Sequence, residues 1–469
     1  MTRLLSVASE CVPLVKTGGL ADVVGALPGA LAPLGVEMRT LLPGYPAVMK
    51  AVTDGRKVAD WPDLFGGPAR LIEGALGDHV LYALDAPHLY DREGAIYLGP
   101  DGKDWPDNPQ RFAALSRVAA LIGADGVGGW VPQVLHLHDW QAGLAPTYLR
   151  HLGADGRVGT LITIHNIAFQ GLAPEKMLNE LHLRPGDFTQ DGVEYWGQIS
   201  ALKAALVHAD AISTVSPTYA QELMTPDFGM GLDGVIRARA ADVTGILNGI
   251  DTDIWTPPYK TIRGKARHRK ALRAEMGLPD WPGPVCVVIS RLTEQKGLDL
   301  LLDALPALVD RGGQLALLGS GDAKLEAAFK EAAAHPGVAV RIGYDEGLAR
   351  RLIAGGDAIL VPSRFEPCGL TQLYGLRFGT LPLVGLTGGL ADTVINASPA
   401  ALAAKCATGL QFHPVTLQAL AGALMRLCEL YEDRPLWERM AKNAMDTPVG
   451  WEASAPAYAA LYEKLTKSS

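Results

Sequence analysis

The sequence lacks the features that mark several large classes of protein. No apolar run reaches the roughly 18 residues that a membrane-spanning helix needs. The five cysteines are an odd number without CxxC spacing, which predicts reduced core thiols rather than a disulfide framework. The HxxEH, Walker A and GxSxG patterns are absent, which lowers the metalloprotease, nucleoside-triphosphatase and serine-hydrolase hypotheses.

An excess of positive charge is missing as well. The chain has 42 Lys and Arg residues against 50 Asp and Glu residues, a net charge of −8. This balance argues against nucleic acid as the main partner, although a local basic site is compatible with it. Residues 1–9 are too short and wrongly flanked for a signal peptide, so we expect a cytoplasmic protein with no membrane partner.

Short apolar runs alternate with helical patterns along most of the chain. This alternation predicts an α/β fold with two mostly parallel sheets, and 469 residues are enough for two or three domains. Strands are expected at residues 3–8, 36–42, 79–84, 133–138, 159–164, 211–215, 243–247, 285–289, 314–318, 338–342, 357–362 and 381–384. Helices are expected at residues 20–34, 108–123, 140–150, 198–208, 369–378 and 451–465.

One segment interrupts the alternation and predicts how the chain divides. Residues 252–283 are polar, basic and contain prolines, so they are the predicted linker. We expect an N-terminal domain at residues 1–245, a C-terminal domain at 246–449 and a final helix at 450–469. That helix has an apolar stripe that it cannot bury alone, so it is expected to pack across the domain boundary.

Glycine-rich loops follow two of the predicted strands. Gly-Gly-Leu-Ala-Asp occurs at residues 18–22 and again at 388–392, each time between a strand and a helix. Backbone amides at such helix starts can face an anion, and ligands of open parallel sheets bind beyond the carboxyl ends of the strands. Lys16 adds a charge suited to a phosphate. A plain tight turn and an ordinary surface lysine are the alternatives.

Two cations, Arg291 and Lys296, share one loop after the strand at residues 285–289. They suit a diphosphate whose charge must be neutralised as it leaves, with a solvated loop as the alternative. Gly319-Ser-Gly321 is half of a dinucleotide fingerprint, but Lys324 stands where the third glycine would be. It is therefore poor evidence for NAD, and we expect no cofactor.

Single polar residues at other strand ends extend the candidate set. Glu366 lies in the loop after the strand at residues 357–362, where a carboxylate can hold sugar hydroxyls or face a developing positive charge. An ion pair with Arg364 is the alternative. Asp139 and His165 end strands of the first sheet, where a helix cap and a structural histidine are the alternatives.

Two further motifs lie near the predicted domain boundary. Asn248 precedes a glycine and is a turn residue first and a ligand contact second. Asp251-Thr-Asp253 has the DxD form that metal-dependent sugar-nucleotide enzymes use. It does not end a strand within one nucleotide-binding domain, so we expect a loop or a helix cap there and no metal.

Motifs in a specific order carry a family resemblance over nearly the whole chain. In the first half they are KTGGLADVVGALP at 16–28, HDW at 138–140, TIHN at 163–166 and SPTY at 216–219. In the second half they are NGID at 248–251, SRLT at 290–293 with KG at 296–297, and PSRFEPCGLTQ at 362–372. Together they resemble bacterial glycogen synthases and their starch synthase relatives.

The resemblance implies both a fold and a reaction. The fold is the GT-B architecture, two Rossmann-like domains facing across a deep cleft, with the acceptor on the N-terminal side and the nucleotide sugar on the C-terminal side. The reaction is transfer of glucose from ADP-glucose to the non-reducing end of glycogen or another α-1,4-glucan, with retention and without a metal. No carboxylate matches a nucleophile of the kind that retaining glycosidases use, so the resemblance implies same-face attack assisted by the departing phosphate.

The resemblance also implies a role for individual residues. Those expected to carry catalysis are His165, Glu366, Arg291, Lys296 and Asp139. Those expected to bind the donor are Lys16, Gly18 and Gly19 with Thr371, Gly389 and Leu390 near the phosphates, Asn248 and Tyr97 near the sugar, Cys368 beside Glu366, and Tyr344 beside the adenine.

Three other functions stay open at this point. An NAD-dependent oxidoreductase would need a complete GxGxxG followed by an acid, which neither half offers. A non-catalytic glucan-binding protein of the same fold is opposed by the intact Lys16, Arg291, Lys296 and Glu366. UDP-glucose remains an alternative donor because Tyr344 does not separate adenine from uracil. The sequence leaves the oligomeric state unknown.

Overall fold

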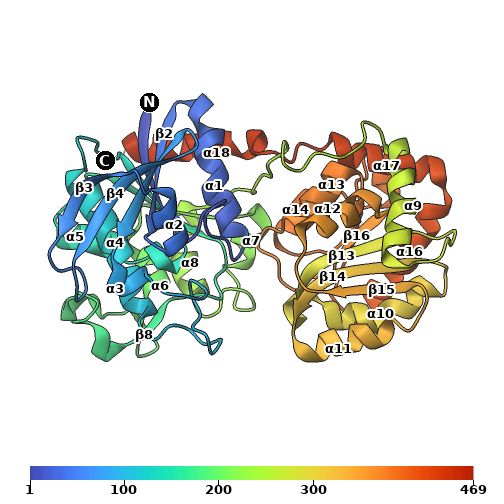
Figure 1. Cartoon of the computed structure of the whole chain (residues 1–469), viewed down its shortest axis with the longest axis horizontal. Helices are drawn as coiled ribbons and strands as arrows, with labels where there is room; N and C mark the ends of the chain where they lie inside the picture. The colour runs from blue at the N-terminus through green and yellow to red at the C-terminus, as the bar shows by residue number, and fades with distance from the viewer. Residues whose placement is uncertain (468–469) are drawn as a thin grey trace. The chain divides into compact units, whose positions relative to one another are not determined.

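The structure is a computed structural model that describes residues 1–467. The chain forms two units, of which unit 1 contains residues 1–247 and 454–467, and unit 2 contains residues 248–453. In Figure 1 unit 1 is drawn from blue to green except for the red C-terminal helix α18 (Trp451–Lys467), and the strands and helices of unit 2 run from yellow to red. Each unit is an α/β body built around its own sheet, so the expected fold class is confirmed.

Unit 1 is built on a sheet of nine strands within the described residues. In spatial order they are β12 (Val243–Gly245), β11 (Ala211–Thr214), β7 (Gly159–Ile164), β6 (Val134–His138), β1 (Thr2–Val7), β2 (Val36–Pro43), β5 (His79–Asp85), β4 (Ala69–Leu76) and β3 (Arg56–Trp61). The strands from β12 to β5 are parallel, and β4 and β3 extend that edge antiparallel. β1 is central because its apolar residues are buried on both faces, as parallel strands require.

Helices and one small sheet complete unit 1. The helices are α1 (Gly19–Leu31), α2 (Pro46–Ala51), α3 (Pro87–Tyr90), α4 (Asn108–Asp125), α5 (Ala145–His151), α6 (Ala201–His208), α7 (Pro217–Glu222), α8 (Asp233–Ala238) and most of α18 (Trp451–Lys467). The small antiparallel sheet has the order β8 (Leu172–Pro174), β10 (Gln198–Ser200), β9 (Glu194–Tyr195).

Unit 2 has an all-parallel sheet with the order of a doubly wound fold. In spatial order its strands are β15 (Val338–Ile342), β14 (Gln314–Gly321), β13 (Val285–Leu292), β16 (Ala358–Val361), β17 (Leu381–Gly385) and β18 (Leu410–Phe412). The chain begins at the centre with β13 and continues to β15 on one side. It then returns past β13 to β16, so the order reverses between β13 and β16.

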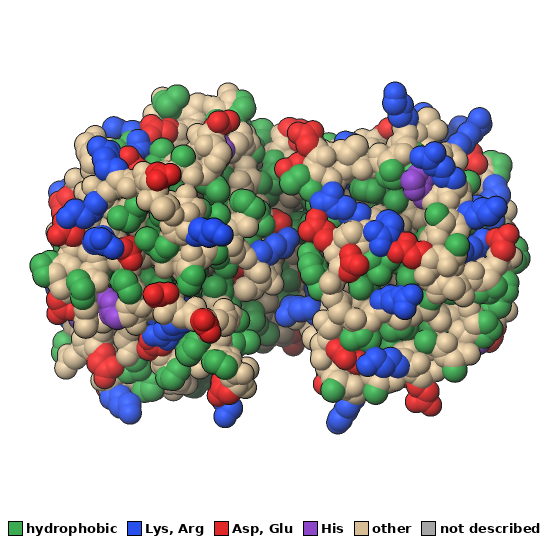
Figure 2. Space-filling view, in the orientation of Figure 1, with side chains coloured by type: hydrophobic (Ala, Val, Ile, Leu, Met, Phe, Trp, Pro, Cys, Tyr) green, Lys and Arg blue, Asp and Glu red, His purple; other side chains and the backbone are tan. Residues whose placement is uncertain are grey.

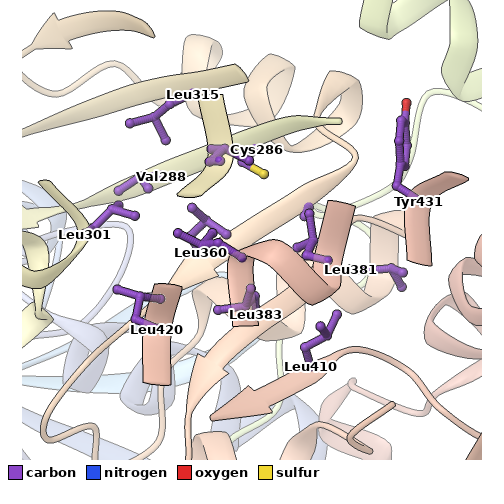
Figure 3. Packing of buried hydrophobic residues seen from close by; sticks show 14 of the residues in the cluster. Cys286, Val288, Leu301, Leu315, Leu360, Leu381, Leu383, Leu410, Leu420 and Tyr431 are labelled. Carbon is purple, nitrogen blue, oxygen red and sulfur yellow. The ribbon is translucent and has the colours of Figure 1, made fainter. Parts of the chain in front are cut away.

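Alternate residues of each strand in unit 2 face opposite layers of helices. Val285 and Val287 of β13 pack with α9 and α12, whereas Cys286 and Val288 pack with α10 and α16. Figure 3 shows the second layer, in which Cys286 and Val288 lie close to side chains of neighbouring strands and helices. The helices are α9 (Lys265–Met276), α10 (Leu298–Val309), α11 (Ala323–Ala332), α12 (Glu346–Gly355), α13 (Thr371–Phe378), α14 (Gly388–Thr393), α15 (Pro399–Ala403), α16 (Leu417–Glu432) and α17 (Arg434–Asp446).

Two expectations from the sequence are wrong, and two strands were not expected. Residues 252–283 are not a linker, because they contain α9, whose Leu272 and Met276 are buried in unit 2. Residues 198–200 are strand β10 rather than the start of a helix. The antiparallel strands β3 and β4 were not expected, because they are only partly buried and have no continuous apolar run.

The repeated Gly-Gly-Leu-Ala-Asp sequence starts a helix each time, as expected. α1 follows the first strand of unit 1, whereas α14 follows β17, the fifth strand of unit 2. The two copies therefore do not occupy equivalent places in the two sheets. The similarity of the units therefore lies in their strand order.

Within residues 1–467, no helix combines the length and apolarity needed to cross a membrane. On the face drawn in Figure 2, acidic and basic side chains are interspersed over both units.

Candidate active site

The candidate residues of unit 1 follow three adjacent strands. β7, β6 and β1 are neighbours in the sheet, and the loops after them carry His165, Asp139 and the segment from Glu10 to Gly19. The strand order of unit 1 reverses between β1 and β6, and in open α/β sheets ligands bind at such a point. The topology therefore brings these loops to one edge of the sheet.

A buried carboxylate, Glu10, organises the loop after β1. It accepts hydrogen bonds from the amides of Thr17 and Gly18 at 2.5 and 3.1 Å, and from the Thr17 hydroxyl at 2.7 Å. The hydroxyl of Tyr97 lies 2.9 Å from Glu10 and 2.6 Å from Ser9. Tyr97 is thus fixed beside the glycine loop, and its burial raises its pKa well above the ordinary value.

The sequence reasoning missed Glu10. The signal that could have found it is an acid directly after a buried strand, six residues before Lys16. Its two carboxylate oxygens give the loop at residues 16–19 its shape, because they accept donors that the start of α1 leaves unpaired.

The glycine loop is open on its outer side. Gly18 has an extended backbone with φ of −152°, and a Cβ placed on it would meet nothing within 4 Å. The fold of unit 1 therefore does not require glycine at this position. Gly19 begins α1, and Lys16 is half-exposed with its Nζ 2.8 Å from Asp22 in the first turn of that helix.

Asp139 has a strained backbone and holds the loop that contains His165. Its φ is +54°, in the left-handed region that non-glycine residues rarely adopt. Its carboxylate accepts the amide of His165 at 2.7 Å and that of Asn166 at 3.4 Å. Burial raises the pKa of Asp139 to about 7, opposed by these two hydrogen bonds.

His165 is tied to a chain of buried polar groups. Its Nε2 lies 3.0 Å from Nδ1 of His138, whose Nε2 lies 3.1 Å from the hydroxyl of Ser6. Burial lowers the pKa of His165 to about 3. His165 is therefore a neutral imidazole at pH 7, suited to hydrogen bonding with a hydroxyl rather than to carrying charge.

The candidate residues of unit 2 meet at the point where its strand order reverses. Lys296, in the loop after β13, forms an ion pair of 2.5 Å with Glu366, in the loop after β16. The same carboxylate oxygen accepts the hydroxyl of Ser363 at 3.0 Å. The proposed alternative partner of Glu366 is wrong, because Arg364 instead pairs with Asp299 through two contacts of 2.6 Å.

Arg291 differs from Lys296 in having no protein partner for its charge. It is exposed at the end of β13, and within the described residues its guanidinium forms no ion pair. An unpaired cation beside a paired one leaves positive charge available at this edge of unit 2. Such charge suits an anionic group of a ligand.

The second Gly-Gly pair closes against the loop that carries Glu366. A Cβ on Gly388 would lie 1.9 Å from the carbonyl oxygen of Glu366, and one on Gly389 would lie 2.2 Å from that of Cys368. The amide of Gly389 donates to the Glu366 carbonyl at 3.2 Å. Glycine is thus required by packing at both positions, in contrast to Gly18.

Other residues predicted for the donor site have varied surroundings in unit 2. Cys368 is buried, and burial raises its pKa to about 12, so it is a neutral thiol. Thr371 begins α13, and Leu390 is fully buried in α14. Asn248 is buried, and its Oδ1 has no hydrogen-bond partner in the described part of the chain. Tyr344 is 81% exposed after β15.

Asp251 shapes the turn that contains Asp253. The carboxylate of Asp251 accepts the amides of Asp253 and Ile254, both at 2.9 Å, and so caps a turn, as expected. No group of three or more His, Cys, Asp or Glu side chains among residues 1–467 is arranged to hold a metal ion.

Comparisons with known proteins place the chain in a family. A model of the starch synthase catalytic domain matches residues 3–238, and a model of group 1 glycosyl transferases matches residues 283–429. A glycogen synthase from Paracoccus denitrificans is 70% identical, covering 99% of this chain and all of the relative. The chain belongs to the glycogen and starch synthase family. A glycogen synthase from Jannaschia is 60% identical over 99% of both chains.

Solved structures of glycosyltransferases agree with membership of this family. The catalytic domain of starch synthase IV from Arabidopsis thaliana, bound to ADP and acarbose, has a TM-score of 0.86 at 28% identity, with 99% of each chain covered. A sucrose-phosphate synthase from Thermosynechococcus elongatus has a TM-score of 0.63 at 20% identity over both whole chains, a likeness of fold alone. The expected GT-B class is thereby confirmed for this synthase-family chain.

Proposed function

We propose that the chain is a retaining glucosyltransferase that transfers glucose from ADP-glucose to the non-reducing end of an α-1,4-glucan such as glycogen. The observation that carries the proposal is the cluster at the strand-order reversal of unit 2. There the Lys296–Glu366 ion pair lies in loops next to the unpaired charge of Arg291. The glycogen synthase relatives support the reaction, and the ADP bound to starch synthase IV supports ADP as the nucleotide.

The two cations of unit 2 act on the leaving group. When the bond between the anomeric carbon and the diphosphate breaks, negative charge develops on the departing ADP and positive charge on the sugar. Arg291, at the end of β13, and Lys296, in the turn that follows it, stabilise the first through their positive charge. Glu366 orients Lys296 and offers a carboxylate to sugar hydroxyls. Tyr344 is exposed, so its ring is available to stack on a base.

Unit 1 offers hydrogen-bonding groups suited to the transferred glucose. The neutral imidazole of His165 and the carboxyl of Asp139 suit sugar hydroxyls, and the Gly18–Gly19 loop with Lys16 offers amides and a charge to the phosphates. The acceptor hydroxyl attacks the same face that the diphosphate leaves, and its proton passes to a departing phosphate oxygen. The enzyme is also expected in the cytoplasm, which cell fractionation would test.

A label-transfer assay tests the proposal and separates the two donors. Purified protein and glycogen are mixed with labelled ADP-glucose or labelled UDP-glucose, each with and without EDTA. Label entering glycogen from ADP-glucose, at a rate that EDTA leaves unchanged, is the expected result. Transfer from UDP-glucose alone would keep the proposed reaction but identify UDP-glucose, rather than ADP-glucose, as the donor. No transfer by folded protein from either donor would refute the reaction and favour a glucan-binding protein.

A further inference from the structure

Four large apolar side chains stand exposed around the small sheet of unit 1. Phe169 is 58% exposed, Leu172 43%, Trp196 82% and Met230 46%. Trp196 is at the tip of the hairpin that joins β9 to β10, and Leu172 begins β8, which pairs with β10. Exposed aromatic and apolar groups gathered in this way mark an interaction site more often than single exposed residues do.

Hydrogen bonds fix the three segments that carry these side chains. The hydroxyl of Tyr195 donates to the Met230 carbonyl at 2.7 Å, and Nε2 of Gln170 donates to the same carbonyl at 3.1 Å. A Cβ on Gly231 would lie 3.7 Å from Nε1 of Trp196, so the indole borders the turn that follows Met230. The side chains are thus presented on a rigid base, which reduces the entropy that binding would cost.

The chain holds two of these side chains against their backbone preference. Trp196 and Gly197 have φ of +49° and +77°, and Met230 and Gly231 have φ of +47° and +82°. Two-residue turns with both φ values positive favour Asn-Gly, because asparagine tolerates the left-handed region better than bulky residues do. Neither side chain is buried, so packing within unit 1 does not explain why a tryptophan and a methionine occupy these positions.

The surface is continuous with the candidate glucose site through a short loop. Phe169 follows His165 by four residues, and its amide donates to the Asn166 carbonyl at 3.3 Å. Gln170 comes next, and its buried Oε1 has no hydrogen-bond partner within residues 1–467. Its Nε2 ties this loop to the segment that carries Met230.

We infer that Phe169, Trp196 and Met230 form a platform on which an α-1,4-glucan chain stacks, leading outward from His165. Glucose rings present apolar C–H faces and a rim of hydroxyls. Flat aromatic rings suit the faces, and the exposed amide of Gln198 suits the rim. None of these side chains is charged, which fits a neutral polysaccharide. The identity of the ligand as a glucan rests on the proposed function. Phe169, Trp196 and Met230 are called the glucan platform below.

Affinity electrophoresis in gels that contain glycogen tests the platform without requiring activity. The main variant is Trp196→Asn, which accepts the left-handed backbone and so keeps the hairpin. Trp196→Phe keeps a flat ring, and Trp196→Leu keeps apolar area without one. Leu34→Ala, at another exposed apolar residue of unit 1, is the matched control. We expect Trp196→Asn and Trp196→Leu to weaken glycogen binding about fivefold or more, and Trp196→Phe and Leu34→Ala to stay within about twofold.

Kinetics and light scattering complete the test. Trp196→Asn should raise the KM for glycogen while kcat and the KM for ADP-glucose stay unchanged. Wild-type binding by Trp196→Asn, or retained binding by Trp196→Leu, would overturn the platform. Light scattering measures the oligomeric state of both proteins. If the wild type is a dimer and Trp196→Asn is a monomer, the surface binds a second copy of the chain, and the glucan platform is overturned as well. Absence of transfer from any donor would refute the proposed reaction, whereas binding in the gel would still support the platform.

Discussion

Nδ1 of His138 lies 3.0 Å from Nε2 of His165, in a contact that needs one donor and one acceptor. Burial lowers the pKa of His165 to about 3 and that of His138 well below its ordinary value, so both rings are neutral at pH 7. The position of the proton on one ring therefore determines its position on the other. The hydroxyl of Ser6, in β1, lies 3.1 Å from Nε2 of His138 and holds the other side of that ring. His138 is a positioning residue for His165.

Two substitutions at His138 separate positioning from packing. Asparagine places a polar atom near the Nδ1 position and can keep the bond to His165, whereas glutamine places one near Nε2 and keeps the bond to Ser6. We expect His138→Gln to lower kcat about tenfold, the effect of one lost hydrogen bond, and His138→Asn to recover most of it. Steady-state kinetics with labelled ADP-glucose measures this. Equal losses of kcat and thermal stability in both variants would indicate a packing role alone.

Arg291 and Lys296 should differ in their effects on stability. Arg291 forms no ion pair within the described residues, so Arg291→Ala should change the free energy of unfolding by no more than about 0.5 kcal/mol. Lys296→Ala leaves the buried Glu366 carboxylate unpaired and should cost about 3 kcal/mol. Both should lower kcat by about 100-fold or more, because both stabilise the leaving diphosphate. Urea unfolding and kcat measured on the same preparations check the contrast.

The controls for this pair restore one property at a time. Lys296→Arg retains the charge opposite Glu366 and should recover stability more than activity. Glycogen affinity should be unaffected in Arg291→Ala. An unchanged kcat in Arg291→Ala would remove Arg291 from the leaving-group site.

Gly18 and Gly389 belong to similar sequences but should respond oppositely to alanine. A Cβ at Gly18 meets nothing within 4 Å and its backbone is extended, so Gly18→Ala should fold normally. If the donor approaches that loop, the same methyl should raise the KM for ADP-glucose severalfold. Gly389→Ala places a Cβ 2.2 Å from the Cys368 carbonyl and should destabilise unit 2. Normal kinetics for a folded Gly18→Ala would place the donor elsewhere.

The alternation of apolar runs and helical patterns was enough to predict the two α/β units. Buried parallel strands such as β1 and β13 are continuous apolar runs, and the loops after them carry the polar residues, so the strand ends of the site were identifiable. The antiparallel strands β3 and β4 were missed because half-exposed strands have no such run. α9 was missed because its basic residues conceal the buried Leu272 and Met276.

Pairing within the site could not be predicted from the sequence. Arg364 is only two residues from Glu366, whereas Lys296 is 70 residues away and is brought to it by the pairing of β13 with β16. Glu10 and His138 were missed as members of the site because their roles depend on contacts with residues far away in the chain. Such contacts follow from strand order, which local patterns leave undetermined.

Stability should fall as the pH drops below about 6.5, the ordinary pKa of histidine. Burial lowers the pKa of His136 and His165 to about 3 and lowers that of His138, so the unfolded chain binds protons that the folded one excludes. Asp139 acts in the opposite direction. Its pKa of about 7 stabilises the fold as the pH falls from 7 toward 4. The three histidines lower the free energy of unfolding in acid by more than Asp139 raises it, so the net effect of acid is destabilising.

Replacing His136 should flatten this pH dependence. Each such histidine contributes a slope of about 1.4 kcal/mol per pH unit below 6.5, and His136→Gln should remove one slope. Calorimetry of the unfolding transition that involves unit 1, between about pH 7 and 5, measures this slope of stability against pH. An Asp139→Asn control should steepen the acid loss, since it removes the opposing group. An unchanged slope in His136→Gln would mean that His136 is protonated in the folded state.

Trp196→Asn should make the protein more stable while it weakens glucan binding. The left-handed backbone at Trp196, with φ of +49°, costs about 1 kcal/mol for a bulky residue, and asparagine relieves part of it. Because the indole is 82% exposed, its loss removes little packing within unit 1. We expect a gain of about 0.5–1 kcal/mol by urea unfolding, whereas Gly197→Ala, at φ of +77°, should lose stability. A destabilised Trp196→Asn would show that the indole is held by packing, and the strain argument for the glucan platform would then fail.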